Sequence, residues 1–393
     1  MSLSASDQYA FELIKQCKPQ WSGLCKVSDV IGERQLLLHA GPPFSSTDLI
    51  PTPIMNSLVI GAVWEGWAMD YAQARQMILA KEISVASAQD HDIVVPLAGV
   101  VSPSMTLMII QNANQPAKRK YSVLNEGMVH CTRLGKLDET LLGHLSWLNG
   151  ELACWLTTRL VQPIDLLPVI NAALADGDDC HGRTIVSSAL LHQRLADMSK
   201  ESIPTEINDF LQQSLAFALN VWMAACCLMM SAAEGVVGSS LVTKAAGNGI
   251  EFGIQLAAAP GKWVTTAAPA INGAIDPSHQ GRTALGALGD SAVVDFMGLG
   301  GQVLNTAHAS REALGNYLPG NALQRPIMAL AAALPGFEQR LAVTCARNVV
   351  ASGAGPLTLL GMIEDKGEAG RIGGGVADAP VSLFERALQE AGL

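Results

Sequence analysis

Charged residues are scarce in this chain: they make up 15% of its 393 residues, whereas 49% are hydrophobic. A globular domain usually contains about 25% charged residues. Two explanations fit the deficit. Either part of the surface is buried in an oligomer or against a partner, or the chain is an enzyme rich in glycine and alanine with a large core.

Basic charge is in especially short supply, because 35 acidic residues outnumber 25 basic ones and the net charge is −10. The longest basic run is only Lys118-Arg119-Lys120, which we interpret as a solvated turn. Neutralising a phosphate backbone requires clustered Lys and Arg. The composition therefore argues against a nucleic-acid partner.

Signals for export and membrane insertion are missing as well. The first residues, MSLSASDQYAFELIKQ, lack the basic start and apolar stretch of a signal peptide. The eight cysteines form no CxxC pair, which fits reduced thiols in a cytoplasmic protein. The apolar segment 214–238 is long enough for a bilayer but lacks basic and aromatic anchors at its ends. We expect a buried helix there, a cytoplasmic location and no membrane partner.

Common catalytic and metal-binding motifs are also absent. The chain contains no GxSxG, no GxxxxGK[ST] and no HExxH. Its eight histidines do not show the spacing of a structural metal site. Asp90, His91 and Asp92 could act together as metal ligands, but a solvated loop is the simpler interpretation. We expect neither a metal nor a cofactor.

Hydrophobic periodicity divides the chain into three parts and predicts a mixed α/β, multi-domain fold. Residues 1–135 form an N-terminal α/β domain, 136–235 a mainly helical domain, and 236–393 a C-terminal glycine-rich α/β domain. Helices are expected at 6–17, 54–80, 141–160, 164–175, 184–198, 204–233, 322–333 and 381–391. Strands are expected at 35–39, 83–86, 93–97, 106–111, 121–124, 250–256 and 263–266.

The glycines gather in clusters beside small polar residues. These clusters are HAGPP (39–43), PLAGVVSPSM (96–105), LNEG (124–127), GNGIEFG (247–253), GDSA (289–292), GLGG (298–301) and GRIGGG (370–375). Glycine permits positive φ and a close approach of the backbone to a ligand, and successive N–H groups form anion sites. Singly, each cluster predicts only a tight turn, whereas seven together favour at least one ligand loop. In GDSAVVDF, either Asp290 or Ser291 caps a helix, or the helix N-terminus faces a carboxylate or phosphate.

Seven segments occur in an order that resembles the AllG (YlbE-like) family: LLLHAGPP, GAVWEGWAMDYAQA, PLAGVVSPSM, SVLNEG, HGRTIVSSALL, GNGIEFGI and GDSAVVDFMGLGG. The resemblance covers nearly the whole chain. It implies a mixed α/β fold with a helical insert, and a place in an oxamate carbamoyltransferase assembly with AllH-like and FdrA-like partners. That assembly is associated with anaerobic allantoin breakdown. It interconverts oxalurate plus phosphate with oxamate plus carbamoyl phosphate.

This reaction requires donors that stabilise a developing oxyanion and groups that orient two small anions. We expect catalytic roles for His39, Glu126, His181, Arg183 and Asp290. We expect substrate binding by Gly41, Ser104, Asn125, Asn248, Gly249, Ser291, Gly300 and Gly301. Structural alternatives stay open: His39 caps a turn, Arg183 forms an interhelix ion pair, and Asn125 and Glu126 stabilise a turn.

Two further expectations concern the arrangement of these residues. Asn125, Asn248 and Asp290 should converge on one cleft between domains. In addition, Asp290→Ala should harm ligand binding more than folding.

The C-terminal loop departs from the family pattern. Glu364, Asp365 and Asp378 stand where the family usually has His, Lys and Arg. Opposite charges about 4 Å apart near a surface attract by a few kcal/mol. The reversal should therefore make the loop repel anions, and the positive charge of Arg371 should offset part of this repulsion.

Two functions follow, and whether the chain is itself an enzyme stays open between them. The first is a subunit of a carbamoyltransferase-like complex that acts on a small anionic substrate such as oxamate, oxalurate or carbamoyl phosphate. The second is a non-catalytic scaffold or a small-anion-binding paralogue. In both, we expect a homo-oligomer, a complex with AllH-like and FdrA-like subunits, or both.

Overall fold

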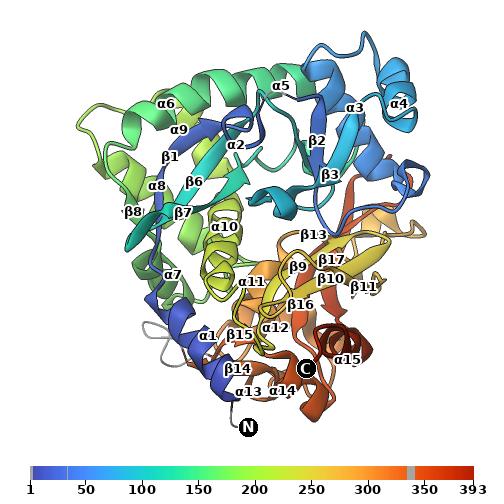
Figure 1. Ribbon diagram of the computed structural model, residues 1–393. Coiled ribbons are helices and arrows are strands. Elements are labelled where there is room, and N and C mark those ends of the chain that lie inside the picture. Colours follow the sequence, from blue (N-terminus) through green and yellow to red (C-terminus); the bar gives the residue numbers. More distant parts are fainter. Residues whose placement is uncertain (1–2, 33, 334–340) are drawn as a thin grey trace.

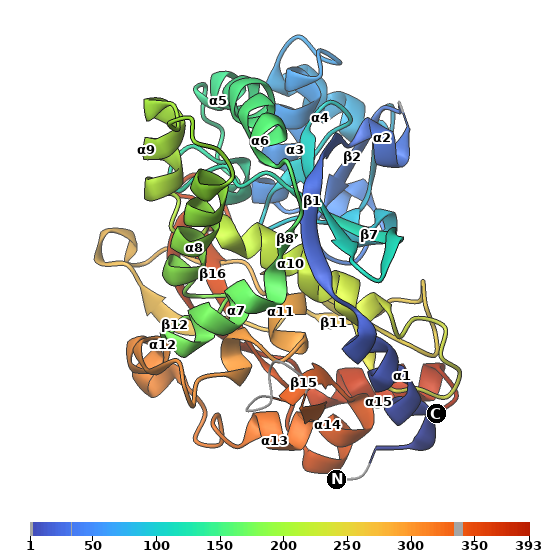
Figure 2. The same cartoon turned by 90° about the vertical axis from the view of Figure 1, so that its left-hand side faces the viewer.

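The computed structural model describes residues 3–32, 34–333 and 341–393, and it confirms a mixed α/β fold. In Figure 1 the green helices of the middle of the chain lie along the top and left, and the blue and teal strands of the first third lie beside them. The yellow to red sheets of the last third lie below and to the right. Figure 2 shows the same arrangement after a quarter turn.

The largest sheet has five strands in the order β4-β7-β6-β1-β8. Its strands are β4 (Ile93–Val94), β7 (Gln115–Val123), β6 (Thr106–Asn112), β1 (Pro19–Lys26) and β8 (Ile164–Asp165). Neighbouring strands are antiparallel except β4 and β7. Strand β1 was not predicted, and β8 brings a short piece of the middle section to the edge of this sheet.

A second sheet of three strands, β3-β2-β5, carries the first glycine cluster at its end. It consists of β3 (Ser84–Ser87), β2 (Leu36–His39) and β5 (Val100–Val101), with β2 parallel to β3 and antiparallel to β5. Helix α3 (Thr52–Trp64) packs on β2 and β5. Strand β2 ends at His39, so the sheet places the turn after it.

The single helix expected at 54–80 is wrong at its centre, because α3 is followed by a separate helix, α4 (Tyr71–Leu79). Gly66 between them has φ 74°. Asp70 caps α4 by accepting a hydrogen bond from the Gln73 backbone N–H, and the Gln73 side chain accepts one from the Met69 N–H. The two bonds form a variant of the capping box, in which Gln73 receives its bond from the residue before the N-cap, and they start a new helix.

The middle of the chain is mainly helical, as expected. Its helices are α5 (Leu141–Trp147), a π-helical turn η4 (Leu148–Leu152), α6 (Ala153–Arg159), α7 (Leu166–Ala175), α8 (Ile185–Asp197), α9 (Thr205–Gln213) and α10 (Phe217–Ser231). The helix predicted over 204–233 is two helices, α9 and α10, with a bend of 68° between them.

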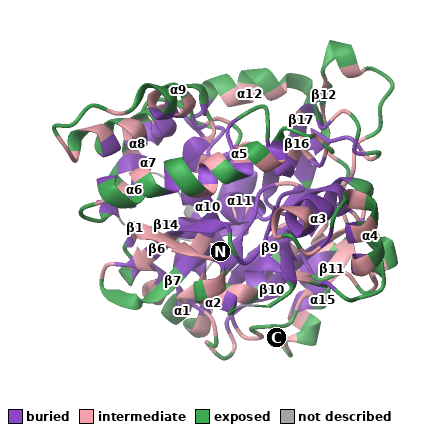
Figure 3. Cartoon of the chain, turned by 90° about the horizontal axis from the view of Figure 1, so that it is seen from above, coloured by how far each residue is buried: buried purple, intermediate pink, exposed green. Residues whose placement is uncertain are grey.

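Helix α10 is the centre of the core. From Phe217 to Met230, every side chain except Leu219 is buried. The helix packs against β1, β4, β6 and β7 and also against β9 and α11, and it lies in the buried interior seen from above in Figure 3. Among the described residues, no single helix is both long and apolar enough to cross a membrane, and α9 and α10 pass that test only as a bent pair.

The last third forms two more sheets. A four-stranded sheet has the order β11-β10-β9-β13, and a three-stranded sheet the order β12-β17-β16. Their strands are β9 (Val242–Asn248), β10 (Glu251–Leu256), β11 (Val264–Ala267), β12 (Asn272–Ile275), β13 (Leu288–Gly289), β16 (Leu357–Ile363) and β17 (Arg371–Asp378).

Short helices and one further strand pair complete this part. The helices are α11 (Ala292–Phe296), α12 (His308–Leu314), α13 (Arg325–Ala329), α14 (Ala346–Ser352) and α15 (Val381–Glu390), and β14 (Leu330–Ala333) pairs with β15 (Leu341–Thr344). The helix predicted over 322–333 is therefore wrong in its second half, which is strand β14.

The first helix, α1 (Ala5–Gln16), is fastened to the last third of the chain. Its Asp7 is fully buried. The Asp7 carboxylate accepts hydrogen bonds from Ser239 and Ser240 and forms an ion pair of 3.0 Å with Arg347. The helix also packs on α10 and β14, which lie beside it in Figure 1.

Candidate functional site

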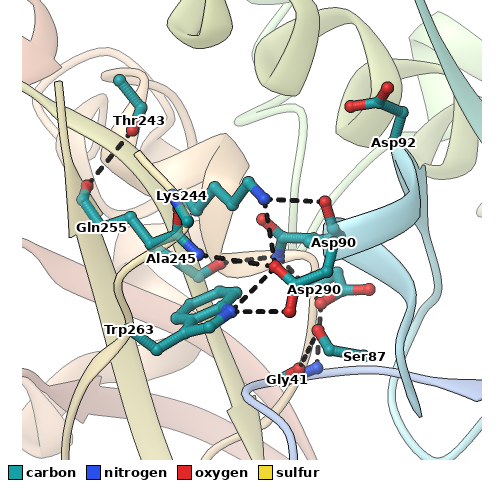
Figure 4. A network of polar contacts seen from close by, with 12 residues as sticks. Gly41, Ser87, Asp90, Asp92, Thr243, Lys244, Ala245, Gln255, Trp263 and Asp290 are labelled. Atoms are coloured by element: carbon teal, nitrogen blue, oxygen red, sulfur yellow. Dashed lines mark hydrogen bonds and ion pairs between the residues drawn. The ribbon is translucent and has the colours of Figure 1, made fainter. Parts of the chain in front are cut away.

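The first group of predicted site residues lies where the turn after β2 meets the loop between β13 and α11 (Figure 4). Asp290 is fully buried. Its carboxylate accepts hydrogen bonds from the backbone N–H groups of Gly41, at 3.0 Å, and Val95, at 2.8 Å, and from Gln89 Nε2, at 2.8 Å. The expectation that Asp290 or Ser291 caps α11 is wrong, because neither side chain caps this helix. The carboxylate instead holds together segments from the first and last thirds.

Gly41 and Asn248 pack against each other in the same group. A Cβ atom on Gly41 would lie 2.5 Å from the Asn248 backbone nitrogen, and Gly41 has φ 88°, so only glycine fits. The Asn248 Nδ2 donates to the Pro42 carbonyl at 3.0 Å, and its Oδ1 accepts from the Ile250 and Glu251 N–H groups. Gly249, with φ 87°, completes the turn. The polar atoms of Asn248 therefore serve to join two loops.

Burial shifts the titration of two residues in this group. It raises the pKa of Asp290 to about 7, although hydrogen bonds from Gly41, Gln89 and Val95 oppose the rise. Burial lowers the pKa of His39 to about 4, and the His39 Nδ1 lies 2.7 Å from the Ala40 carbonyl oxygen. Within the described part of the chain, no Lys, Arg or His forms an ion pair with Asp290. The group thus holds a carboxylate surrounded by neutral donors.

Asp90 and Asp92, beside this group, meet lysines. Asp90 lies 3.2 Å from Lys244 Nζ and accepts a hydrogen bond from Trp263 Nε1 at 3.0 Å (Figure 4). Asp92 lies 2.5 Å from Lys120 Nζ. The described residues contain no group of three or more His, Cys, Asp or Glu side chains arranged for a metal ion.

The second group, Asn125 and Glu126, follows strand β7. Asn125 Nδ2 donates to the Ala216 carbonyl and to Asn220 Oδ1, and Asn125 Oδ1 accepts from the Gly127 N–H. The Glu126 carboxylate accepts from the Thr132 N–H and hydroxyl and from the Arg133 N–H. Both side chains therefore stabilise a turn, and Asn125 also attaches it to α10.

The third group centres on His181 and Asp295. His181 Nδ1 lies 2.6 Å from Asp295 Oδ2, and both side chains are buried. Asp295 Oδ1 accepts hydrogen bonds from the N–H groups of Gly301 and Leu359. A Cβ atom on Gly300, whose φ is 53°, would lie 2.2 Å from the same oxygen. Gly300 and Gly301 therefore wrap the backbone closely around the Asp295 carboxylate.

Asp295 makes His181 a stronger base. Burial disfavours the charged imidazole, but the charge and hydrogen bond of Asp295 outweigh burial and raise the pKa of His181. Burial in turn raises the pKa of Asp295, so the pair retains a proton readily. The bond to Asp295 uses Nδ1, and Nε2 has no hydrogen-bond partner among the described residues. Such an arrangement leaves one ring nitrogen for a substrate proton.

Arg183 follows His181 by two residues, just before α8 begins. Its Nε is 3.8 Å from Asp178 Oδ1, and 38% of its side chain is exposed. The backbone N–H groups of His181 and Arg183 both donate to Asp179 Oδ1. The turn is thus fixed through Asp179, while the guanidinium itself is held only by a long ion pair.

Ser104 lies apart from the three groups. Its backbone N–H and its hydroxyl both donate to Glu65 Oε1, and the residue is exposed. The Glu65 carboxylate therefore already accepts hydrogen bonds from both of these Ser104 donors.

Asn248 and Asp290 meet the same turn at Gly41 and Pro42, but no described contact joins Asn125 to either of them. The expected cleft between domains stays a prediction. The three groups are linked by the residues around Leu97 and by strand β16. The Leu97 backbone lies 2.7 Å from a Cβ placed on Gly289, the Ala98 N–H donates to the Arg133 carbonyl, and Leu359 of β16 donates to Asp295.

The acidic C-terminal loop is better compensated than the sequence suggested. Glu364 lies 2.6 Å from Arg282 and accepts hydrogen bonds from the Glu368 and Ala369 N–H groups. Asp378 pairs with both Nη atoms of Arg325, at 2.6 and 2.8 Å. The expectation that this loop repels anions is therefore wrong for Glu364 and Asp378, because arginines of the same chain balance their charges.

A surface hollow of about 560 Å³ lies elsewhere, between α1 and residues 234–237. None of the predicted site residues lines it. Its position does not support a role in the chemistry of the three groups.

Comparison with known proteins places these loops in a family. Residues 83–291 match the family described as "Oxamate carbamoyltransferase subunit AllG". The chain is 30% identical to the Escherichia coli (strain K12) protein of that name, over 99% of this chain and 97% of the relative. The chain belongs to the AllG family.

Two further proteins are similar to this AllG-family chain over nearly its whole length. It is 29% identical to "Uncharacterized protein YahG" of Escherichia coli (strain K12), over 98% of this chain and 85% of the relative. Its structure matches the crystal structure of a conserved protein of unknown function from Enterococcus faecalis V583 with a TM-score of 0.91 and 27% identity, covering 98% of this chain and 97% of the other.

Sequence reasoning missed two residues of these groups, Asp295 and Arg133. Asp295 lies within VVDF, where it looks like an ordinary residue in the first turn of a helix. Arg133 lies just beyond the LNEG cluster. One rule could have found them. A buried His or carboxylate needs a polar partner, so each charged residue without an assigned role is a candidate for that partner.

Proposed function

We propose that this chain is a subunit of a carbamoyltransferase that moves a carbamoyl group between phosphate and a small carboxylate such as oxamate. The observation that carries the proposal is the buried pair of His181 and Asp295, with the partly exposed Arg183 two residues farther along the chain. The family supports the same reaction, because its described name is that of an oxamate carbamoyltransferase subunit.

In the proposed reaction the amide nitrogen of oxamate attacks the carbonyl carbon of carbamoyl phosphate. A C–N bond forms, the C–O bond to phosphate breaks, and the nitrogen loses one proton. His181 Nε2 accepts this proton, because Asp295 holds Nδ1 and stabilises the imidazolium that forms. Arg183 supplies a positive charge for the carboxylate or the phosphate of the substrates. The products are oxalurate and phosphate.

A second candidate is a scaffold or anion-binding subunit that does not catalyse. One observation favours it: the polar atoms of Asn125, Asn248 and Asp290 are already engaged in hydrogen bonds between segments of the chain. Residues used in this way maintain a fold whether or not chemistry takes place near them.

The test combines binding and turnover. The purified chain is first screened by thermal shift with oxamate, oxalurate, carbamoyl phosphate and phosphate, because a ligand at 100 times its Kd stabilises a protein by roughly 2.7 kcal/mol. The chain is then assayed for phosphate release from carbamoyl phosphate plus oxamate, alone and together with AllH-like and FdrA-like subunits from the same source.

His181→Asn and the matched control His192→Asn separate the two candidates. We expect His181→Asn to abolish most of the turnover, whereas His192, a partly exposed histidine on α8, has no role in the proposed reaction. Ligand binding without turnover in every combination of subunits would reject catalysis and favour the scaffold.

A further inference from the structure

Arg133 is a buried cation without a carboxylate. Its exposure is 8%, yet no described Asp or Glu forms an ion pair with it. The other buried cations of the described residues have partners: Lys120 has Asp92, Lys244 has Asp90, Arg325 has Asp378, and Arg159 lies over the ring of Trp155. An uncompensated buried charge is expensive, so proteins pair it or use it to bind a ligand.

The contacts of the Arg133 guanidinium leave donors unused. Nη2 donates to the Gly127 carbonyl at 2.5 Å, whereas Nη1 is buried and has no hydrogen-bond partner. Glu126 precedes this turn, but its carboxylate is turned toward the Thr132 and Arg133 backbone. The site therefore contains a full positive charge and a free donor, and the carboxylate beside it in the sequence is already occupied.

A second free donor borders the same turn. Trp147 Nε1 is buried and also lacks a hydrogen-bond partner. Trp147 packs edge-on against Phe210, with ring centroids 5.1 Å apart, and the Phe210 ring lies 2.9 Å from a Cβ placed on Gly127. His144 stacks on Trp147 and contacts the Glu126 carbonyl. Aromatic rings and unused N–H groups thus surround the 126–128 turn.

We propose that Arg133 is the anchor for the carboxylate of a small planar acid, held beside the rings of Phe210 and Trp147. A guanidinium fork matches a carboxylate with two parallel hydrogen bonds, and the neighbouring rings suit a flat molecule. This inference deepens the proposed function, on which it rests for the class of ligand, since oxamate and oxalurate are small acids of this kind.

Access to Arg133 depends on one flexible side chain. Met128 Sδ lies 3.8 Å from Arg133 Nη2, and Met128 is 42% exposed. A thioether is only a weak acceptor and an unbranched side chain that changes rotamer easily. Met128 is thus an exposed neighbour of Nη2, and a change of its rotamer is the movement by which we expect an acid to reach the guanidinium.

The experiment measures the Kd of oxamate, oxalurate and inorganic phosphate by calorimetry on the whole purified chain. Hydrogen bonds to a charged group contribute about 1.5–3 kcal/mol each, so we expect Arg133→Met to weaken oxamate binding roughly tenfold to hundredfold. Arg159→Met is the matched control, since Arg159 is also buried, with 4% exposed, and its Nη1 is also unpartnered. It should leave the Kd unchanged.

Two more readouts separate ligand binding from a structural role. Without ligand, Arg133→Met should melt no lower than the wild type, because it removes an uncompensated buried charge. Trp147→Phe, which keeps the ring stacking but removes Nε1, should weaken oxamate binding severalfold. Arg133→Lys keeps the charge but lacks the forked guanidinium, and its Kd for oxamate should lie between those of the wild type and Arg133→Met.

The outcomes are distinct. The inference is overturned if the wild-type chain binds neither oxamate nor oxalurate, if Arg133→Met binds them like the wild type, or if only phosphate binding responds to the substitution. If oxamate binds through Arg133 but no carbamoyl transfer occurs with any combination of subunits, the proposed function is wrong, whereas the role of Arg133 in binding the acid is supported.

Discussion

Asp290 and Asp295 are both fully buried carboxylates in the same glycine-rich region, but they meet different surroundings. Asp290 accepts hydrogen bonds from three neutral donors in distant parts of the chain. Asp295 is hydrogen-bonded to Nδ1 of the His181 imidazole, whose other ring nitrogen has no described partner. In the first arrangement, every described hydrogen bond of the carboxylate joins segments of the chain. In the second, His181 Nε2 has no described partner and is the atom that we propose for a substrate proton. Burial alone therefore does not distinguish the two carboxylates, whereas the unpartnered atom on the partner of Asp295 does.

The largest expected effect is on the Asp295 side of this comparison. Asp295→Asn keeps an oxygen for the Gly301 and Leu359 N–H groups, but its amide donates to His181 Nδ1 and so places the ring proton on Nε2. General acid–base catalysis contributes roughly 10²–10⁴-fold, and we expect the rate of phosphate release to fall by that range. Asp290→Asn should change it little. An equal loss of rate in both variants would remove the distinction.

A large effect on stability is expected on the Asp290 side. Asp290→Ala leaves the Gly41 and Val95 N–H groups without an acceptor, and it leaves Gln89 Nε2 only the Ala245 carbonyl, 3.3 Å away. Each buried donor left unsatisfied costs about 1–3 kcal/mol, so we expect urea unfolding to show a loss of about 3 kcal/mol. Ser291→Ala, which removes a hydroxyl that does not cap α11, is the control. This outcome reverses the order expected from sequence, in which binding suffers more than folding.

A smaller effect follows from pH. Asp290 has a folded pKa of about 7 and an ordinary value of 3.8, so its contribution to stability declines as the pH rises from about 4 to 7. His39 has a folded pKa of about 4 and an ordinary value of 6.5, so its contribution is lost as the pH falls through that window. The two slopes oppose each other between about pH 4 and 6.5.

Single variants should separate the two contributions. In His39→Gln, stability should fall with rising pH, by at most about 1.4 kcal/mol per unit. In Asp290→Asn it should rise with pH. Urea unfolding at several pH values measures both slopes, and two slopes of the same sign would contradict the assigned shifts.

The smallest effect on stability is expected for Arg183. Its ion pair with Asp178 is long and partly exposed, and such pairs contribute about 0–1 kcal/mol. We expect Arg183→Met to leave the Tm nearly unchanged while raising KM for oxamate or carbamoyl phosphate severalfold. Arg194→Met, an exposed arginine on α8, should change neither. A large drop in Tm with an unchanged KM would assign Arg183 a purely structural role.

Local patterns predicted much of the fold. The apolar run that becomes α10 signals a buried helix, and the apolar run before the Gly-Pro-Pro turn signals the buried strand Leu36–His39. Strand β1 was missed because Pro19 and Gly23 weaken its pattern and most of it is only partly buried. The break between α3 and α4 carried a readable signal in Asp70 and Gln73, which form this variant of the capping box.

The candidate site was harder to predict because its pairings are long-range. His181 was selected from a motif, but its partner Asp295 is 114 residues away, and no local pattern indicates that the two meet. The charges of Glu364 and Asp378 were read correctly, whereas the arginines that balance them come from other loops. Sequence alone indicates which groups carry charge, and the fold decides which of them remain unpaired.

The attachment of α1 has a consequence for how this protein is made. Asp7 is synthesised well before its partners Ser239, Ser240 and Arg347, which lie 232 or more residues farther along the chain. The first helix therefore has to wait for most of the chain before it can dock, while N-terminal parts of a protein usually fold first during synthesis. A nascent chain stalled before Arg347 would present α1 undocked, with its apolar residues Phe11 and Ile14 open to chaperones and proteases.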